Sequence, residues 1–88
     1  MKKHTKIYLN YFGYAHSQDE YIPCEVCERQ AVDIHHIIPR GMGGSKTKDY
    51  IENLVALCRE CHIRAERDKS WNEVVKAIHL TKLKLYEK

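Results

Sequence analysis

The sequence predicts one small α+β domain held together by a metal ion, and three observations favour this prediction. The chain has 88 residues, a length that suits one domain and buries only roughly 60–65% of the extended surface, so the apolar core is marginal. Short β-branched runs are followed by segments with helical periodicity. Two Cys-x2-Cys pairs use every cysteine. This length excludes a Rossmann fold, a TIM barrel and a two-domain enzyme with a cleft between cores.

The N-terminal segment combines a basic start with an aromatic stripe. Apolar side chains recur there at positions i, i+1, i+4 and i+5, namely Ile7, Tyr8, Tyr11 and Phe12. This spacing predicts a short helix, which Gly13 ends. Aromatic rings interleaved with lysines can stack on nucleobases, but the simpler interpretation is that they cover a core too small to close itself.

Two short strands are expected in the middle of the chain. Residues 30–39 are rich in β-branched side chains, and Pro39 ends the run. Residues 40–48 form a loop with three glycines and three cationic side chains. Residues 54–57, Leu-Val-Ala-Leu, are the second strand candidate and lead into the second cysteine pair.

The helical segments are indicated by caps and composition. Asp49 and Glu52 have the capping-box spacing, which predicts a brief helical turn. The stretch from residue 59 to about 69 is charged and lacks Gly and Pro, as suits a helix. Ser70 and Glu73 form a second capping box, which begins a C-terminal helix over residues 70–88.

The C-terminal helix has an apolar stripe and a cationic surface. The stripe follows the i, i+3, i+4, i+7 pattern at Trp71, Val74, Val75 and Ile78. The cationic or titratable side chains are Lys76, His79, Lys82, Lys84 and Lys88. They either hold phosphates or form the solvated face of a packing helix, and the second interpretation is the simpler one.

Charge and hydropathy set the cellular context. The formal net charge of +3 suits contact with phosphate but does not prove it. No apolar run reaches the roughly 18 residues of a transmembrane helix, and the basic N-terminus is too polar to be a signal peptide. We therefore expect a cytoplasmic protein whose thiols are reduced.

The four cysteines predict a structural zinc site. Cys24 and Cys27 form one knuckle, and Cys58 and Cys61 form the other. Each x2 spacing places two thiolates on one side of a turn, and four thiolates fill the tetrahedral shell of zinc with no open position. Two disulfides are the alternative, disfavoured in a reducing compartment. A thioredoxin-like redox role is less favoured still, because nothing else in the chain is typical of that fold.

Four further polar residues are not needed by a small core: His35, His36, Asn53 and His62. Side chains of adjacent residues in a strand point to opposite faces, so His35 and His36 serve one site only if the backbone bends or one supports the other. Successive helical residues lie about 100° apart around the axis. Cys61 is therefore able to face the zinc while His62 faces another site.

The order Cys-x2-Cys, His-His-Ile-Ile-Pro, Gly-Gly, Asn-Leu and Leu-Cys-x2-Cys-His resembles the HNH endonuclease family. The resemblance covers residue 24 to about 67 and implies a ββα-metal (His-Me finger) fold, here stapled by the four-cysteine zinc site, with flanking N- and C-terminal helices. We expect one nuclease domain over residues 1–88, with the motif core at 24–67 and the aromatic segment at 1–23.

The resemblance also implies roles in DNA hydrolysis. His36 matches the general base that activates water, and Asn53 matches the asparagine that fixes its orientation through the strand. His62 matches a ligand of the catalytic divalent ion, which would stabilise the leaving 3′-oxygen. His35 is similar to the other ligand and stands where many members carry Asp. The ion would be Mg²⁺, Mn²⁺, Ni²⁺ or Zn²⁺, and two imidazoles favour the last three.

The cations nearest this site in sequence are candidates for DNA contact: Arg40, Lys46, Lys48, Arg59 and Arg64. Arg40 is the first candidate, because it directly follows the His-His-Ile-Ile-Pro run. The alternative for each cation is a solvated surface position. Partner proteins and the oligomeric state are left open.

Two other interpretations remain. The second is a zinc-stapled DNA-binding module without catalysis, although binding alone requires none of His36, Asn53 and His62. A third interpretation places His35 and His62 with the cysteines in one structural zinc cluster, although four cysteines already satisfy one ion.

Overall fold

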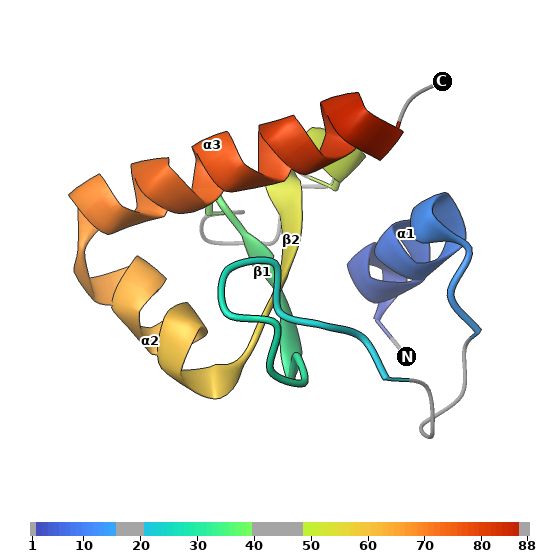
Figure 1. Ribbon diagram of the computed structural model, residues 1–88, viewed down its shortest axis with the longest axis horizontal. Helices are drawn as coiled ribbons and strands as arrows, with labels where there is room; N and C mark the ends of the chain where they lie inside the picture. The colour runs from blue at the N-terminus through green and yellow to red at the C-terminus, as the bar shows by residue number, and fades with distance from the viewer. Residues whose placement is uncertain (1, 16–20, 40–48, 87–88) are drawn as a thin grey trace.

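A two-stranded antiparallel sheet lies between helices on its two faces (Figure 1). The computed structural model describes residues 2–15, 21–39 and 49–86. In chain order the elements are α1 (Lys3–Phe12), β1 (Asp33–His36), the 3-10 turn η2 (Ile51–Asn53), β2 (Leu54–Leu57), α2 (Arg59–Arg67) and α3 (Lys69–Tyr86). The expected α+β fold, with a ββα unit and flanking N- and C-terminal helices, is confirmed.

The register of the sheet decides which residues face which helices. His35 pairs with Val55 and His36 pairs with Leu54, and neighbouring residues of a strand point to opposite faces. All four residues of β2 are buried because both faces of the sheet are covered. The expected strand at 54–57 is confirmed, whereas the strand expected at 30–39 is limited to Asp33–His36.

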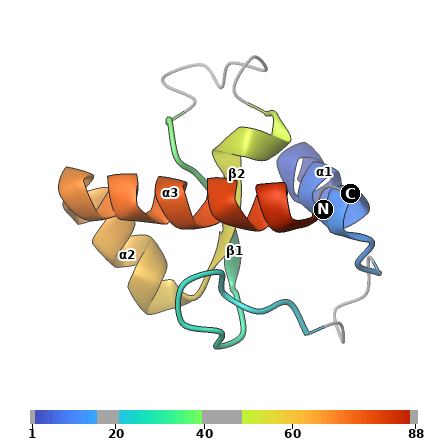
Figure 2. The ribbon, with the colours of Figure 1, turned by 45° about the horizontal axis from the view of Figure 1, so that its top comes forward.

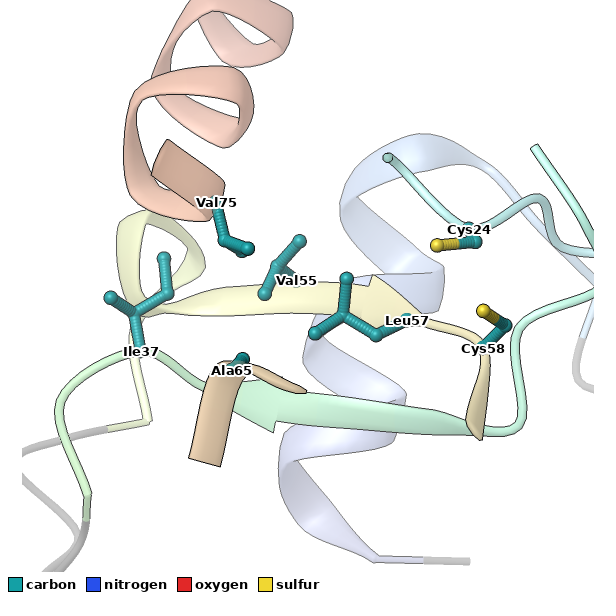
Figure 3. Packing of buried hydrophobic residues seen from close by; sticks show 7 residues of the cluster. All are labelled: Cys24, Ile37, Val55, Leu57, Cys58, Ala65 and Val75. Carbon is teal, nitrogen blue, oxygen red and sulfur yellow. The ribbon is translucent and has the colours of Figure 1, made fainter. Parts of the chain in front are cut away.

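One half of the core lies between the sheet and the helices α2 and α3. Figure 3 shows its buried side chains, which come from the first knuckle, both strand regions and both helices: Cys24, Ile37, Val55, Leu57, Cys58, Ala65 and Val75. Trp71 packs against the edge of this cluster. Cys24 and Cys58 therefore form part of the apolar core, and a metal ion bound to them would directly reinforce it.

The other half of the core lies under α1. Tyr8 and Leu9 pack on Ile34, Leu54 and Ala56 from the opposite face of the sheet. Gly13 ends the helix with a φ of 74°, and its N–H bonds back to the carbonyls of residues 9 and 10. The expected N-terminal helix is confirmed, and the buried ring of Tyr8 supports the interpretation that this aromatic segment covers the core.

The helix α3 crosses over the strands, next to α2 at one end and η2 further along (Figure 2). Its buried face consists of Val75, His79 and Leu83, so the stripe expected from sequence is wrong in part: Val74 is 49% exposed. His79, expected among the surface cations, is fully buried. The buried residues follow an i, i+4 spacing, and because the middle one is a histidine, an apolar pattern does not reveal this face.

No helix in the described ranges is long and apolar enough to cross a membrane.

The start of α3 also differs from expectation. The N–H of Trp71 bonds the carboxylate of Asp68 at 3.2 Å. Asp68 ends α2 and caps α3, a role that the sequence pattern gives to Ser70. Asp68 alone therefore connects α2 to α3, and α3 then runs back over the sheet.

Candidate functional site

The four cysteines converge on one point beside the sheet. The first pair lies in a tight turn in which the N–H of Glu28 bonds the carbonyl of Cys24 at 2.9 Å, and Glu28 takes a left-handed φ of 67°. Cys58 is the N-cap of α2, and Cys61 lies within its first turn. The four sulfur atoms lie within 4.8 Å of one another, and the Cys27 and Cys58 sulfurs are 3.5 Å apart.

The cluster fits a tetrahedral metal ion. Zinc–sulfur bonds of about 2.3 Å place thiolates about 3.8 Å apart, close to the separations seen here. Burial raises the pKa of Cys24, but backbone N–H groups of Cys27, Cys58 and Val26 outweigh it and lower the pKa to about 7. Burial and the neighbouring thiols raise the pKa of Cys61. Four adjacent thiols cannot all ionise without a cation between them, so the donor set is that of a structural metal site.

His35 and His62 meet on the α2 side of the sheet. Their ring centroids are 5.0 Å apart in an edge-to-face arrangement. Nε2 of His62 lies 2.7 Å from a carboxylate oxygen of Glu66, one turn further along α2, and its Nδ1 lies 3.7 Å from Asp33. His35, His62 and Glu66 form a group with metal-ligand spacing, separate from the cysteines.

The side chain of Asn72 sets the tautomer of His35. Nδ2 of Asn72 donates to the carbonyl of Ile37 at 2.9 Å, so its Oδ1, 3.0 Å from Nε2 of His35, must be the acceptor. Nε2 therefore carries the proton and Nδ1 keeps the lone pair. Burial lowers the pKa of His35, which keeps this imidazole neutral, the form that binds metal ions.

His36 lies on the other face, towards α1. Its Nε2 is 2.8 Å from Oδ1 of Asp49, whose side chain is only 3% exposed. The ring of His4 packs edge-on against His36, with centroids 4.5 Å apart. Asp49 was expected to cap the turn before Asn53; instead η2 has Tyr50 as its N-cap, without a side-chain bond. The expected helical turn is present at Ile51–Asn53, but the capping role of Asp49 is wrong, because the His36 imidazole binds its carboxylate instead.

Asn53 joins the end of β1 to the start of β2. Its Oδ1 accepts from the N–H of Ile38 at 2.7 Å, and its Nδ2 donates to the carbonyl of the same residue at 3.0 Å. The backbone carbonyl of Asn53 also accepts from the N–H of Ile37. Asn53 is 2% exposed, so these bonds hold the backbone directly after His36 in one conformation.

All three histidines of the predicted site line one cavity of about 850 Å³ that runs along β1. His4, Glu66 and Asn72 line it too, as do two lysines, Lys2 and Lys69. Neither Arg59 nor Arg64 lines it, and Arg64 lies over the Trp71 ring at 4.7 Å. Arg40, Lys46 and Lys48 lie outside the described residues.

Four residues that contact the site histidines were not predicted as site residues: His4, Asp49, Glu66 and Asn72. Glu66 follows His62 by four residues on an expected helix, and this spacing was a usable signal. The other three reach the histidines only through the tertiary fold. Asn72 is 37 residues from His35 along the chain, a pairing that no local pattern indicates.

Comparison with known proteins agrees with this geometry. The family model described as HNH endonuclease matches residues 24–68. The chain is also 31% identical over 67 residues to the type IV methyl-directed restriction enzyme EcoKMcrA of Escherichia coli (strain K12), a match that covers 65% of this chain but only 23% of that enzyme. No solved structure shows a significant match. On the evidence of the matched segment, the chain belongs to the HNH endonuclease family.

Proposed function

We propose that this domain, residues 1–88, is a metal-dependent endonuclease that hydrolyses DNA phosphodiester bonds. The observation that carries the proposal is the cavity along β1, which presents His35, His36 and His62 to one space. A binding module needs neither a neutral imidazole with an oriented lone pair nor a carboxylate-paired histidine. The relative with a restriction-enzyme name supports DNA as the substrate.

His36 is the general base in this proposal. The Asp49 carboxylate accepts the proton on Nε2, which leaves the lone pair on Nδ1 to take the proton of an attacking water. A carboxylate behind an imidazole fixes its tautomer and stabilises the imidazolium that forms. Asn53 holds the backbone that follows His36 through its two bonds to Ile38. Asp49 and Asn53 act through His36, so both are positioning residues.

His35 and His62 would hold the catalytic divalent ion, with Glu66 as a third donor or as the partner that orients His62. Such an ion would stabilise the negative charge that develops on the phosphate and the leaving oxygen. Asn72 acts on His35 as the outer partner of a metal ligand does. The four cysteines would hold a separate structural zinc ion that keeps α2, and with it His62, against β1.

Phosphate contacts come from lysines at the cavity and from arginines beside it. Lys2 and Lys69 line the cavity, and their ammonium groups suit a backbone that passes along β1. Arg59 and Arg64 lie on exposed positions of α2 and would contact flanking phosphates. Such contacts hold DNA of any sequence and weaken as salt increases.

The test is cleavage of supercoiled plasmid with added Mg²⁺, Mn²⁺ or Ni²⁺. Wild type and the control Val32→Ala, a substitution at an exposed position just before β1, should convert the plasmid, whereas His36→Ala should lose at least about a hundredfold in rate. Binding of DNA by the wild type without cleavage under any of these ions would favour a non-catalytic module. Equal nicking by wild type and His36→Ala would remove the assigned base.

A further inference from the structure

The residues around His36 form a second group of metal donors, and one of them, His4, has no part in the proposed reaction. His4 comes from α1, His36 from β1 and Asp49 from the segment before η2. One donor atom from each lies within 4.8 Å of the others. Side chains 45 positions apart in the sequence converge here, on the face of the sheet opposite to His35 and His62.

His4 is the feature that points to a ligand. Its residue is 7% exposed, it lines the cavity, and it makes no hydrogen bond or ion pair within the described parts of the chain. No fully enclosed side-chain nitrogen in the described residues lacks a hydrogen-bond partner, so the unbonded nitrogens of His4 are open to the cavity. The contact of His4 with His36 is a ring contact, so its lone pair is available to a cation entering from the cavity.

We propose that His4, His36 and Asp49 bind a divalent transition ion of the zinc class, distinct from the catalytic ion. Two imidazoles and a carboxylate are the donor set that such ions prefer, and Mg²⁺ prefers oxygen donors and water. Tetrahedral bonds of about 2.0–2.1 Å need donors about 3.4 Å apart. The His36–Asp49 pair, at 2.8 Å, must open slightly to admit an ion, and His4 offers a third donor atom within 4.8 Å of the other two.

Occupation of this site would switch off the base, a consequence that depends on the proposed function. A neutral imidazole carries one proton. An ion on Nε2 of His36 takes the lone pair of that nitrogen, and the proton moves from Nε2 to Nδ1. Nδ1 then has no lone pair for the proton of the attacking water. Zinc-class ions at this site therefore inhibit cleavage that Mg²⁺ supports.

The binding test counts exchangeable ions. Protein carrying zinc at the cysteines is stripped of weakly held ions with a mild chelator and titrated with Co²⁺, monitored by its visible absorption. Wild type should bind two Co²⁺ per chain, and His4→Phe, which keeps a ring against His36, should bind one. His62→Ala should also bind one, and the double variant none. Lys3→Ala, a neighbour on α1, is the control that keeps two.

The results distinguish a failure of the proposed His4–His36–Asp49 metal site from a failure of the proposed nuclease function. An equal Co²⁺ count in His4→Phe and wild type overturns the site. If His4→Phe loses helical signal, Asp49→Asn provides the second test, with an affinity loss of at least about tenfold expected and an unchanged affinity contradicting the site. In cleavage assays with Mg²⁺, added Zn²⁺ should inhibit Lys3→Ala at concentrations that spare His4→Phe, each relative to its own rate without Zn²⁺. If no protein cleaves DNA but the count still falls, the proposed nuclease function fails and the site stands.

Discussion

Nδ1 of His79 lies 2.8 Å from a carboxylate oxygen of Glu25, and neither side chain has any exposed surface. Nε2 of the same ring lies 2.6 Å from the carbonyl of Ile51, which can only accept. Nδ1 faces the Glu25 carboxyl group, so when that group is ionised both ring nitrogens donate and the two side chains form an ion pair. Tyr8 donates to the other oxygen of Glu25 at 2.6 Å.

This network joins parts of the molecule that the apolar core leaves separate. Glu25 lies between Cys24 and Cys27 in the first knuckle, His79 lies on α3, and Tyr8 lies on α1. The carboxylate thus ties the turn that carries two cysteines to a helix on each face of the sheet. A buried charge pair is costly to break, because the remaining partner stays in an apolar environment without compensation.

We predict that His79→Ala is strongly destabilising. The substitution leaves the Glu25 carboxylate buried beside Tyr8 alone, and the cost of an uncompensated buried charge is about 3–5 kcal/mol. The free energy of unfolding from urea denaturation measures it. Val74→Ala, on the exposed side of the same helix, serves as the control and should change stability by less than about 0.5 kcal/mol. Similar losses in the two variants would contradict the role of the ion pair.

The behaviour of Tyr8 at alkaline pH provides a second prediction. Burial and the Glu25 charge raise the pKa of Tyr8 well above its ordinary value of 10.0. A raised folded-state pKa gives stability that is present below pH 10 and is lost as pH rises above it, because only the unfolded chain then releases this proton. The unfolding free energy of wild type should therefore fall more steeply between pH 9.5 and 11.5 than that of Tyr8→Phe, by up to about 1.4 kcal/mol per pH unit. Parallel slopes would show that this phenol is not protected.

The local elements of this fold could be predicted because their signals are local. Leu54–Leu57 is four apolar residues directly before Cys58, and the strand has those bounds. Gly13 ends α1 through its own backbone conformation. The convergence of the cysteines follows from their spacing, since each pair spans one turn and one ion accepts four thiolates.

The residues that the sequence left undetected are those whose partners lie far along the chain. His79 is one turn after Val75 on the buried face of α3, but its partner Glu25 is 54 residues away. Asp49 has the capping-box spacing, and local spacing does not reveal that His36 binds its carboxylate. In both cases the packing of a helix or turn on the sheet brings a carboxylate into contact with a histidine, Glu25 with His79 and Asp49 with His36. Tertiary contacts override local preference at such positions.

Asn53 should be needed for both stability and cleavage. Asn53→Ala removes two bonds to the Ile38 backbone, and we expect a loss of about 1–3 kcal/mol in unfolding free energy. The backbone after His36 is then unrestrained, so the cleavage rate should fall by about 10–100-fold in protein that is still folded. Glu52→Ala, an exposed neighbour in η2, is the matched control. A stable but fully active Asn53→Ala protein would leave Asn53 without a positioning role.

The two proposed kinds of metal site should fail in different ways when their ligands are removed. Cys27→Ala opens the four-thiolate cluster, whose zinc would contribute about 10 kcal/mol or more to a marginal core, so the protein should lose its helical circular dichroism. His62→Ala removes a ligand that is 23% exposed at the edge of the cavity and contributes little to the core. It should keep the helical signal and bind one exchangeable ion fewer. A strong chelator should reproduce the first result and a mild chelator the second. If His62→Ala unfolds as Cys27→Ala does, His62 belongs to the structural metal site rather than to a catalytic one.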